Sequence, residues 1–406
     1  MADKIFGDLR ESIAGRISNL HSVTDEELYA FIDEAVEGAE ADNYMPVARK
    51  LALRSDLYDS FRRLDILQEL IDRRDITEIM INGRRDIFIE HRGRVERWDK
   101  EFSSDEQLED MIQHIVSRVN RMVNTASPIA DARLEDGSRV HVVLPPISLS
   151  GPVITIRKFP DPIGMEQLIS FGAISREAAS LLKRLVRAGY NIFISGGTNS
   201  GKTTFLNALS SYIPDDERVI TIEDSAELQL RHISNLVRLE ARMANSQGEG
   251  AVSIADLIKA SLRMNPDRIV VGEIRGAEAL DMLQAMNTGH DGSLSTGHGN
   301  NPKDMLSRME TMVMSGAALP LPAIRGQIAA AIDIMVHLGR LRDRSRRVLS
   351  ITEVCGYEEG EIRLSPIYEF RETGSERGRV IGELVKVGKI TDTRKLEAAG
   401  DRLQDL

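Results

Sequence analysis

The sequence has little cysteine and no long apolar run. Cys355 is the only cysteine among 406 residues, which excludes an internal disulfide bond and a zinc module built on paired CxxC motifs. No segment approaches the roughly 20 consecutive apolar residues that a membrane helix needs. The first residues are charged throughout, so we expect neither a signal peptide nor direct membrane insertion. These absences favour a cytoplasmic protein that reaches the inner face of a membrane only through partners.

The sequence also has fewer basic than acidic residues. The chain carries 52 Lys and Arg against 63 Asp and Glu, a formal net charge of −11. Because proteins bind nucleic-acid backbones through Lys and Arg, this balance argues against a broad nucleic-acid surface, although a basic channel inside an acidic protein stays open. The composition is otherwise that of a globular protein, with 42% hydrophobic residues and enough length for two or more domains.

The periodicity of apolar residues divides the chain into four parts. Helical spacing comes first, and short β-like runs around one helix follow. A stretch with Pro and Gly comes next, and helices that alternate with β-branched strands complete the sequence, a pattern typical of a parallel α/β sheet. We therefore predict a helical accessory segment at 1–62, an α+β domain at 63–160, a linker at 161–175 and an α/β domain at 176–406.

Individual elements follow from the same patterns. Thr24 and Glu27 form a capping box, which predicts that a helix begins there. In the α+β domain we expect a helix from about residue 104. The strands expected in that domain are 79–81, 87–89, 140–144 and 153–156.

A glycine-rich loop joins the apolar strand 192–195 to a helical pattern at 205–209. Its residues are Gly196, Gly197, Thr198, Asn199, Ser200, Gly201, Lys202, Thr203 and Thr204. This is a P-loop in the strand–loop–helix setting that it requires, because glycines let backbone N–H groups turn onto phosphate oxygens at a helix N-terminus. We predict that the loop binds ATP, with Lys202 at the β- and γ-phosphates and the Thr203 hydroxyl on Mg²⁺.

Two later strands end in carboxylates. The run 219–222 leads to Glu223, and the run 269–271 leads to Gly272 and Glu273. In a parallel sheet the carboxyl ends of strands face the nucleotide, so Glu223 can orient or deprotonate the attacking water. Glu273 has the Walker B form with Glu in place of Asp, which suits water-mediated Mg²⁺ binding. Taken alone, either carboxylate can also be a helix cap or a solvated charge.

Histidine and arginine supply further candidates. His298 lies in a glycine-rich segment, where a neutral imidazole can sense the γ-phosphate or position water, or can be structural. Arginine fingers are expected in such ATPases, and for each arginine a solvated charge is the alternative. The candidates, all in segments read as polar turns, are Arg133, Arg139, Arg238, Arg242 and Arg263.

Four motifs in order, GGTNSGKTT, TIEDSAELQL, RIVVGEIRG and NTGHDGSLSTGHGN, resemble the Walker A, Asp box, Walker B and His box of the secretion and type IV pilus ATPase superfamily. The segments SPIADARLEDGSRVHVVLPP and LPAIRGQIAAAIDIMVHLGRLRDRSRRVLSITEV resemble its CpaF, or tight-adherence, branch, so the similarity covers roughly residues 65–370. The resemblance implies a RecA-like motor domain, a PAS-like sensing domain before it, a homohexameric ring and an integral membrane platform protein as partner.

The resemblance also implies roles for individual residues. It assigns phosphate binding to Lys202, Mg²⁺ binding to Thr203 and Glu273, water activation to Glu223 and the His-box role to His298. At position 299 the chain has Gly where the family usually has Ala.

For the arginines, the resemblance implies that Arg133 and Arg139 contact nucleotide from the N-terminal domain. Arg238, Arg242 and Arg263 would act across a domain or subunit boundary. The sequence thus favours an ATP-hydrolysing motor for a Flp or Tad-like pilus or a related secretion machine. The alternatives are a conjugative DNA-transfer ATPase and a nucleotide-gated scaffold without useful turnover.

Overall fold

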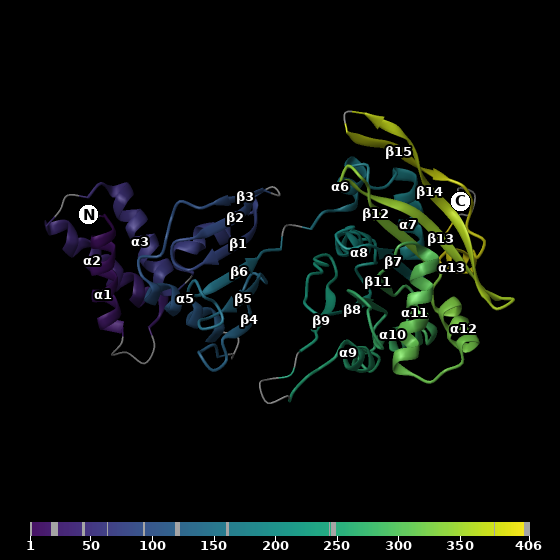
Figure 1. Ribbon diagram of the computed structural model, residues 1–406, viewed down its shortest axis with the longest axis horizontal. Coiled ribbons are helices and arrows are strands. Elements are labelled where there is room, and N and C mark those ends of the chain that lie inside the picture. The colour runs from purple at the N-terminus through teal and green to yellow at the C-terminus, as the bar shows by residue number, and fades with distance from the viewer. Residues whose placement is uncertain are drawn as a thin grey trace. The chain divides into compact units, whose positions relative to one another are not determined.

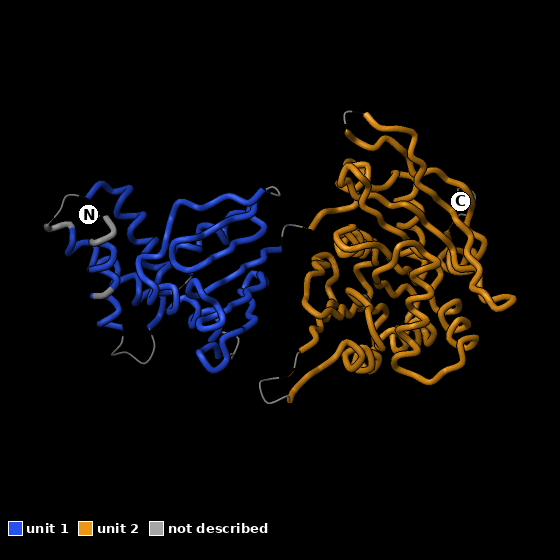
Figure 2. Tube along the Cα trace, in the orientation of Figure 1, with its two compact units in different colours: residues 1–161 blue, residues 162–406 orange. Residues whose placement is uncertain are grey.

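The computed structural model describes residues 2–17, 23–42, 45–62, 64–91, 94–117, 122–159, 162–242, 244, 249–376 and 378–401. The chain forms two compact units, Met1–Asp161 and Pro162–Leu406 (Figure 2).

The first part of unit 1 is a set of three helices, α1 (Ala2–Ile17), α2 (Asp25–Asp42) and α3 (Val47–Arg62) (Figure 1). The helix predicted from the capping box is confirmed as α2. The backbone N–H of Thr24 donates to the Glu27 carboxylate (2.8 Å), and the N–H of Glu27 donates to the Thr24 hydroxyl (3.2 Å). A small separate core holds the three helices together, formed by Ile13, Leu28, Ile32, Val36 and Leu57.

The rest of unit 1 is a six-stranded antiparallel sheet in the order β3-β2-β1-β6-β5-β4. Its strands are β1 (Ile76–Asn82), β2 (Ile87–His91), β3 (Arg94–Arg97), β4 (Ile129–Arg133), β5 (Arg139–Val143) and β6 (Val153–Arg157). Its helical elements are η1 (Asp65–Leu67), α4 (Gln68–Asp72) and α5 (Asp105–Ser117), so the four predicted strands and the predicted helix are present.

The reading of Arg133 and Arg139 as turn residues is wrong. Arg133 ends β4 and Arg139 begins β5, where the two residues face each other in the antiparallel register. The turn is the short connection between them, where the Gly137 N–H donates to the Leu134 carbonyl (2.9 Å). Strand β4 was not predicted because Ala130 is its only buried residue, so the sequence shows no alternation of apolar and polar side chains there.

A buried lysine, Lys158, directly follows the last strand of unit 1. Lys158 is 8% exposed, and its ammonium donates to the main-chain carbonyls of Leu70 (2.9 Å), Ile71 (2.6 Å) and Arg73. These carbonyls lie at the end of α4, where a helix leaves C=O groups without intrahelical partners. Burial lowers the pKa of Lys158. Its role is therefore to cap this helix.

Unit 2 is built on a nine-stranded sheet in the order β15-β14-β13-β12-β7-β11-β10-β8-β9. The six strands from β12 to β9 run parallel, and β13, β14 and β15 extend the sheet as antiparallel hairpins. The strands are β7 (Ile192–Gly196), β8 (Arg218–Glu223), β9 (Asn235–Glu240), β10 (Arg268–Val271), β11 (Leu294–His298), β12 (Ile334–Arg340), β13 (Arg346–Glu358), β14 (Glu361–Glu376) and β15 (Arg379–Lys386). The parallel part is the α/β pattern expected from the sequence; the antiparallel extension was not predicted.

Helices cover both faces of the parallel part. They are α6 (Met165–Ser170), α7 (Arg176–Arg187), α8 (Lys202–Ser210), α9 (Ile254–Ser261), α10 (Glu278–Asn287), α11 (Pro302–Gly316), α12 (Leu321–Ala331) and, near the C-terminus, α13 (Arg394–Ala398). One core packs α6, α7 and α8 against Ile192 and Ile194, and the other packs α9 to α12 against Phe193. Successive residues of β7 are buried on opposite faces, which explains its unbroken apolar run.

The segment predicted as a linker, 161–175, contains α6. Met165 and Leu168 of this helix are 5% and 9% exposed and belong to the core of unit 2. Residues 162–175 are therefore part of unit 2. The Pro and Gly residues prevent regular structure over only a few positions, and the apolar side chains of α6 then pack into the core. Residue 161 lies outside the described part of the chain.

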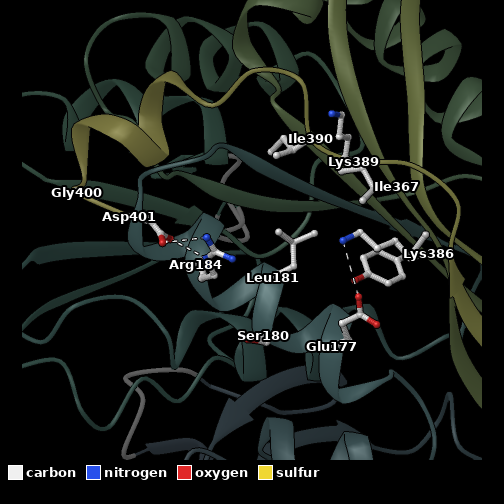
Figure 3. Close-up of a pocket in the computed structure, with 11 residues that line it drawn as sticks. Glu177, Ser180, Leu181, Arg184, Ile367, Lys386, Lys389, Ile390, Gly400 and Asp401 are labelled. Atoms are coloured by element: carbon white, nitrogen blue, oxygen red, sulfur yellow. Dashed lines mark hydrogen bonds and ion pairs between the residues drawn. The ribbon is translucent and has the colours of Figure 1, made fainter. Parts of the chain in front are cut away.

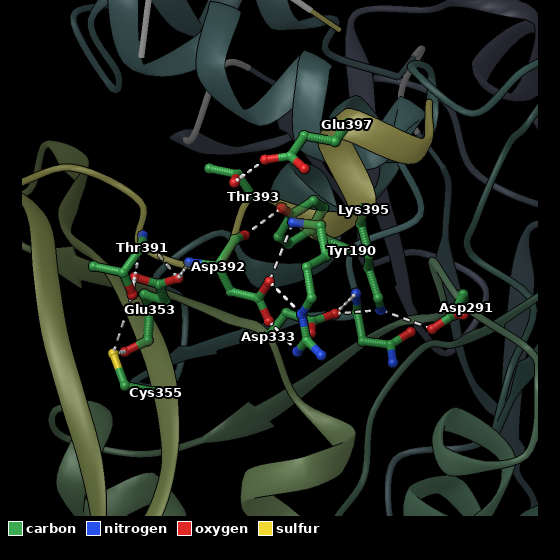
Figure 4. Close-up of polar contacts among 12 residues, drawn as sticks. Tyr190, Asp291, Asp333, Glu353, Cys355, Thr391, Asp392, Thr393, Lys395 and Glu397 are labelled. Carbon is green, nitrogen blue, oxygen red and sulfur yellow. Dashed lines mark hydrogen bonds and ion pairs between the residues drawn. The ribbon is translucent and has the colours of Figure 1, made fainter. Parts of the chain in front are cut away.

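The C-terminal segment is fixed to the sheet by buried polar contacts (Figure 4). The Glu353 carboxylate, 2% exposed, accepts from the backbone N–H groups of Thr391 (2.9 Å) and Asp392 (2.8 Å). Lys395 of α13 donates to the Asp333 carboxylate (2.7 Å). This segment and α7 line a cavity of about 450 Å³ (Figure 3).

None of the helices in the described ranges is both long and apolar enough to cross a membrane.

Candidate nucleotide-binding site

The glycine-rich loop turns sharply between β7 and α8. Gly201 has a φ of 93° and Asn199 a φ of 59°, both in the left-handed region. At Gly196 a Cβ atom would lie 2.5 Å from the Ser200 hydroxyl and 2.6 Å from the Leu338 carbonyl oxygen. Only glycine fits there, so the loop folds tightly against β12 at the end of its own strand.

The inside of this loop offers donors to an anion. Helix α8 begins at Lys202, and its N-cap, Gly201, provides no side-chain hydrogen bond to the first backbone N–H groups. Among the described residues nothing hydrogen-bonds the Ser200 hydroxyl oxygen, although Ser200 is only 2% exposed. A buried hydroxyl and uncapped N–H groups at a helix N-terminus suit phosphate oxygens. The loop therefore fits the nucleotide phosphates that the sequence predicts.

Lys202, His298 and Glu273 form a chain of contacts across three strand ends. The Lys202 ammonium lies 3.2 Å from His298 Nδ1 and donates to the Gly197 carbonyl (3.2 Å). On the other side of the ring, His298 Nε2 lies 2.9 Å from Glu273 Oε1. The 2.9 Å approach brings the ring close to the carboxylate without hydrogen-bond geometry, since Glu273 Oε1 has no hydrogen-bond partner among the described residues. Burial lowers the pKa of Lys202, and the charge of Glu273 opposes this effect.

Glu223 ends β8 in a closed environment. Its side chain is 3% exposed, and its carboxylate accepts from the backbone N–H groups of Glu227 (2.9 Å) and Leu228 (3.0 Å). Burial raises the pKa of Glu223 to about 7, against the opposing effect of these two hydrogen bonds. A Cβ atom at Gly272 would lie 2.9 Å from Glu223 Cγ, so Gly272 leaves the space that this side chain fills beside Glu273.

The strand order brings these groups together. Strands β7, β11, β10 and β8 are consecutive neighbours, and at their carboxyl ends stand the loop, His298, Glu273 and Glu223. Thr203 lies in the first turn of α8. Hydroxyl and carboxylate oxygens suit Mg²⁺, which usually also binds substrate phosphates, and no group of three potential His, Cys, Asp or Glu ligands occurs in the described residues. Thr203 and Glu273 therefore fit a metal that is shared with a nucleotide.

The candidate arginines lie in different places and make different contacts. The reading of Arg238 as a turn residue is wrong, because it lies on β9, opposite Thr221 of β8. Its charge there favours the ionised form of Glu223 and so lowers the pKa of Glu223. Arg242 donates to the Gly250 carbonyl (2.6 Å), a contact with the chain shortly before α9.

Arg263 follows α9 and precedes β10, whereas Glu273 comes after β10. Arg263 is thus at the opposite edge of the sheet from the site of its own chain, because the whole strand separates the two residues. A role for Arg263 across a subunit boundary stays a prediction, as does the role of Arg133 and Arg139, which belong to the other unit.

The sequence reading missed His337, whose Nδ1 lies 2.9 Å from the Ser195 hydroxyl directly before the loop. A signal was present, since His337 is the one polar residue in the apolar run 334–338.

The structure also explains Gly299. A Cβ atom there would lie 2.9 Å from Met305 Cβ, because α11 packs closely under the His298 segment.

The fold and site define a P-loop ATPase class with a RecA-like motor domain, preceded by an α+β domain and a helical segment. The type II/IV secretion system protein family matches residues 62–398, and the chain belongs to this family. This confirms the superfamily and the fold class that the four motifs suggested.

Relatives and solved structures agree with this assignment. A putative conjugal transfer protein of Mycobacterium tuberculosis is 33% identical over 328 residues, which cover 79% of this chain and 92% of that protein. The type IV secretion system protein PtlH of Bordetella pertussis is 33% identical over 315 residues, covering 71% and 93%. The crystal structure of the pilus retraction motor PilT with bound ADP is similar in fold, with a TM-score of 0.54 at 19% identity, covering 82% of this chain and 86% of that one. The ATPase DotB of Legionella pneumophila has a TM-score of 0.52 at 22% identity, covering 72% and 80%.

Proposed function

We propose that this protein is a Mg²⁺-dependent ATPase that works as a homohexameric ring. The ring powers assembly of a Flp or Tad-like type IV pilus, or of a related secretion machine, through an integral membrane platform protein at the inner face of the cell membrane. The observation that carries the ATPase proposal is the contact chain Lys202–His298–Glu273 beside the buried Glu223.

Each of these groups has a distinct task in hydrolysis. The loop N–H groups and Lys202 bind the phosphates and offset the charge that develops on them. Glu223, with a pKa of about 7, accepts the proton of the attacking water, since a base is most effective when its pKa lies near the working pH. His298 contacts both Lys202 and Glu273, so it can report phosphate occupancy at the loop to the Walker B strand. Mg²⁺ held by Thr203 and Glu273 would neutralise phosphate charge.

The ring and the arginines belong to the same proposal. Arg133 and Arg139 of unit 1 complete the nucleotide site when the sensing domain closes over it. Arg238, Arg242 and Arg263 act across a domain or subunit boundary. The exposed position of Arg263, at the sheet edge away from its own site, supports a neighbouring subunit as its target. Nucleotide binding and release then open and close the domains, which turns hydrolysis into motion.

A second candidate is a conjugative DNA-transfer ATPase. The mycobacterial relative is named a putative conjugal transfer protein, which favours this candidate. The net charge of −11 counts against a protein that itself contacts DNA. Binding of a fluorescent single-stranded oligonucleotide by the assembled protein at 0.15 M salt separates the two, because the pilus motor requires none.

The test of the proposed function is hydrolysis by the purified protein with Mg²⁺, alone and with membranes that contain its secretion machinery. Lys202→Ala, Glu273→Ala and Glu223→Gln are each expected to lower kcat by about 10²–10⁴-fold. Glu223→Gln keeps nucleotide binding, and Lys389→Ala, an exposed lysine away from the loop, keeps wild-type turnover. The assembly state is measured on the same samples by analytical ultracentrifugation.

The outcomes are distinct. Turnover by a hexamer that the three substitutions abolish supports the motor. Nucleotide binding without turnover in every condition, including the membranes, refutes it in favour of the nucleotide-gated scaffold.

A further inference from the structure

Five arginines lie within eight residues on the hairpin that joins β12 to β13. They are Arg340, Arg342, Arg344, Arg346 and Arg347. Such a density of positive charge stands out in a chain with a net charge of −11. The hairpin follows the carboxyl end of β12, and β12 runs parallel to its neighbour β7. The five arginines are therefore at the same edge of the sheet as the phosphate loop, which follows β7.

Two of the five arginines hold the hairpin in place. Arg342 donates to the Glu372 carboxylate (2.6 Å), and Arg347 donates to the Gly172 carbonyl (2.6 Å). The other three are exposed, and across the described ranges of the chain their side chains make no hydrogen bond or ion pair; they are Arg340, Arg344 and Arg346. These three guanidinium groups are available to a ligand.

Two of the available arginines face each other. Arg340 and Arg346 are directly opposite in the antiparallel register of β12 and β13. Like charges in that position destabilise a strand pair. The acid in the turn between them, Asp343, instead accepts from the backbone N–H groups of Ser345 (2.9 Å) and Val380 (2.8 Å). The opposed arginines thus form a cationic position that an anion would stabilise.

The opposed arginines lie on the face of the sheet that α8 covers. Leu338 and Val348 belong to the core that contains α8. Arg340 and Arg346 are two residues closer to the turn on the same strands, and every second side chain of a strand shares a face. A Cβ atom at Gly201, the N-cap of α8, would lie 3.4 Å from Arg346 Cδ. The Arg346 side chain therefore passes beside the phosphate loop where α8 begins.

We propose that Arg340 and Arg346 are part of the nucleotide site and bind the α-phosphate of ADP or ATP. The inference rests on the proposed ATPase function. His298, Glu273 and Glu223 stand at the ends of β11, β10 and β8, all on one side of β7, whereas β12 and β13 are on the other. A nucleotide whose terminal phosphate points toward His298 has its α-phosphate on the β12 side. Guanidinium groups suit this position, because their planar fork binds phosphate oxygens bidentately.

This placement predicts an effect on nucleotide binding and little effect on the chemical step. The α-phosphate is present in both ATP and ADP, and it is not the phosphate that is transferred to water. A contact with it stabilises the bound substrate and the transition state alike, so its loss raises KM and leaves kcat nearly unchanged. An arginine at the reacting phosphate would have the opposite signature.

The variants remove charge without removing the side chain. Arg340→Gln and Arg346→Gln each keep an amide and most of the aliphatic stem. Arg346→Lys keeps the charge and loses the planar fork. The matched control is Arg344→Asn, which removes one positive charge from the same hairpin. Arg344 has a φ of 67°, a conformation that asparagine tolerates.

The measurements are ADP affinity by titration calorimetry, kcat and KM for Mg-ATP, and Tm with and without ADP. Arg340→Gln and Arg346→Gln should each weaken ADP binding and raise KM by about 10-fold, with kcat within about threefold of wild type. Arg346→Lys should fall between Arg346→Gln and wild type. Arg344→Asn should stay within about twofold of wild type in ADP affinity.

Thermal unfolding separates a binding role from a structural one. Without ADP, Arg346→Gln should unfold at the wild-type Tm or above it, because the repulsion from Arg340 is gone. With ADP, its Tm should rise less than that of wild type, because the ligand binds more weakly. A structural role would instead lower the Tm of the nucleotide-free variant.

Three results would overturn the proposal. The first is an ADP affinity for Arg346→Gln within twofold of wild type. The second is an equal loss in Arg344→Asn, which would reflect only the general charge of the hairpin. The third is a large fall in kcat with unchanged ADP affinity, which would place the arginines at the reacting phosphate.

Failure of the proposed function gives a different result. A wild-type protein that binds ADP but shows no turnover in any condition refutes the motor, while the comparison of ADP affinities still decides the role of Arg340 and Arg346. A wild-type protein that binds neither ADP nor ATP refutes both.

Discussion

Glu223→Gln tests the environment of the proposed base through protein stability, independently of turnover. A folded pKa of about 7 lies above the ordinary value of 4.5, so the folded protein binds this proton more tightly than the unfolded chain does. The stability contribution of the protonated carboxyl is fully present below pH 4.5 and is lost as the pH rises toward 7. Linkage over these two pKa values gives a loss of about 2.5 kcal/mol between pH 5 and pH 8.

Glutamine removes this loss without removing the main contacts. Both backbone N–H groups, of Glu227 and Leu228, donate to Glu223 Oε1, and the amide oxygen of glutamine can take that position. The variant should therefore gain about 2.5 kcal/mol relative to wild type on going from pH 5 to pH 8. Other groups that titrate in this range contribute equally to both proteins and cancel in the difference.

The assay is urea unfolding of both proteins at the two pH values, at one protein concentration and with the assembly state checked. Asp216→Asn, an exposed carboxylate before β8, is the control and should change the pH dependence by less than about 0.5 kcal/mol. An equal stability difference between wild type and Glu223→Gln at pH 5 and pH 8 would refute the reasoning. It would mean that the carboxyl is solvated or otherwise stabilised as an anion.

Three further predictions concern the framework of the site. Lys158→Met leaves three carbonyls at the end of α4 without their donor and should destabilise unit 1 by about 2–4 kcal/mol, seen by calorimetry as a lower first transition; an unchanged transition contradicts the capping role. Gly299→Ala, although it restores the usual family residue, forces a Cβ against Met305 and should cost about 1–3 kcal/mol and lower kcat, and wild-type values for both would show that α11 yields freely. Glu353→Leu removes the acceptor of the Thr391 N–H and should make the C-terminal segment sensitive to limited proteolysis, whereas an unaltered cleavage pattern would mean that the other contacts suffice.

Local sequence patterns predicted much of the fold. The capping box at Thr24 and Glu27 predicted where α2 begins, because both partners lie within one turn. Alternation of helices with apolar strands predicted the parallel sheet, which lies between the two cores of unit 2. The antiparallel strands β13 to β15 escaped prediction, since their partly exposed residues mix polar and apolar side chains without one clear period.

The candidate site shows the same division. The sequence by itself determined the loop, because Gly196 to Thr204 are contiguous and their chemistry follows from backbone conformation alone. It also placed carboxylates at strand ends. It did not determine which strands are neighbours, and that choice decides which groups meet.

Only the tertiary structure decided the long-range contacts. It packed Glu223 against Gly272, put Arg263 at the far edge of the sheet, and joined Ser195 to a histidine 142 residues away. The physical reason is that hydrophobic periodicity determines only which face of a strand is buried. The partner on that face depends on strand order and register, and these depend on the packing of all helices and strands of unit 2.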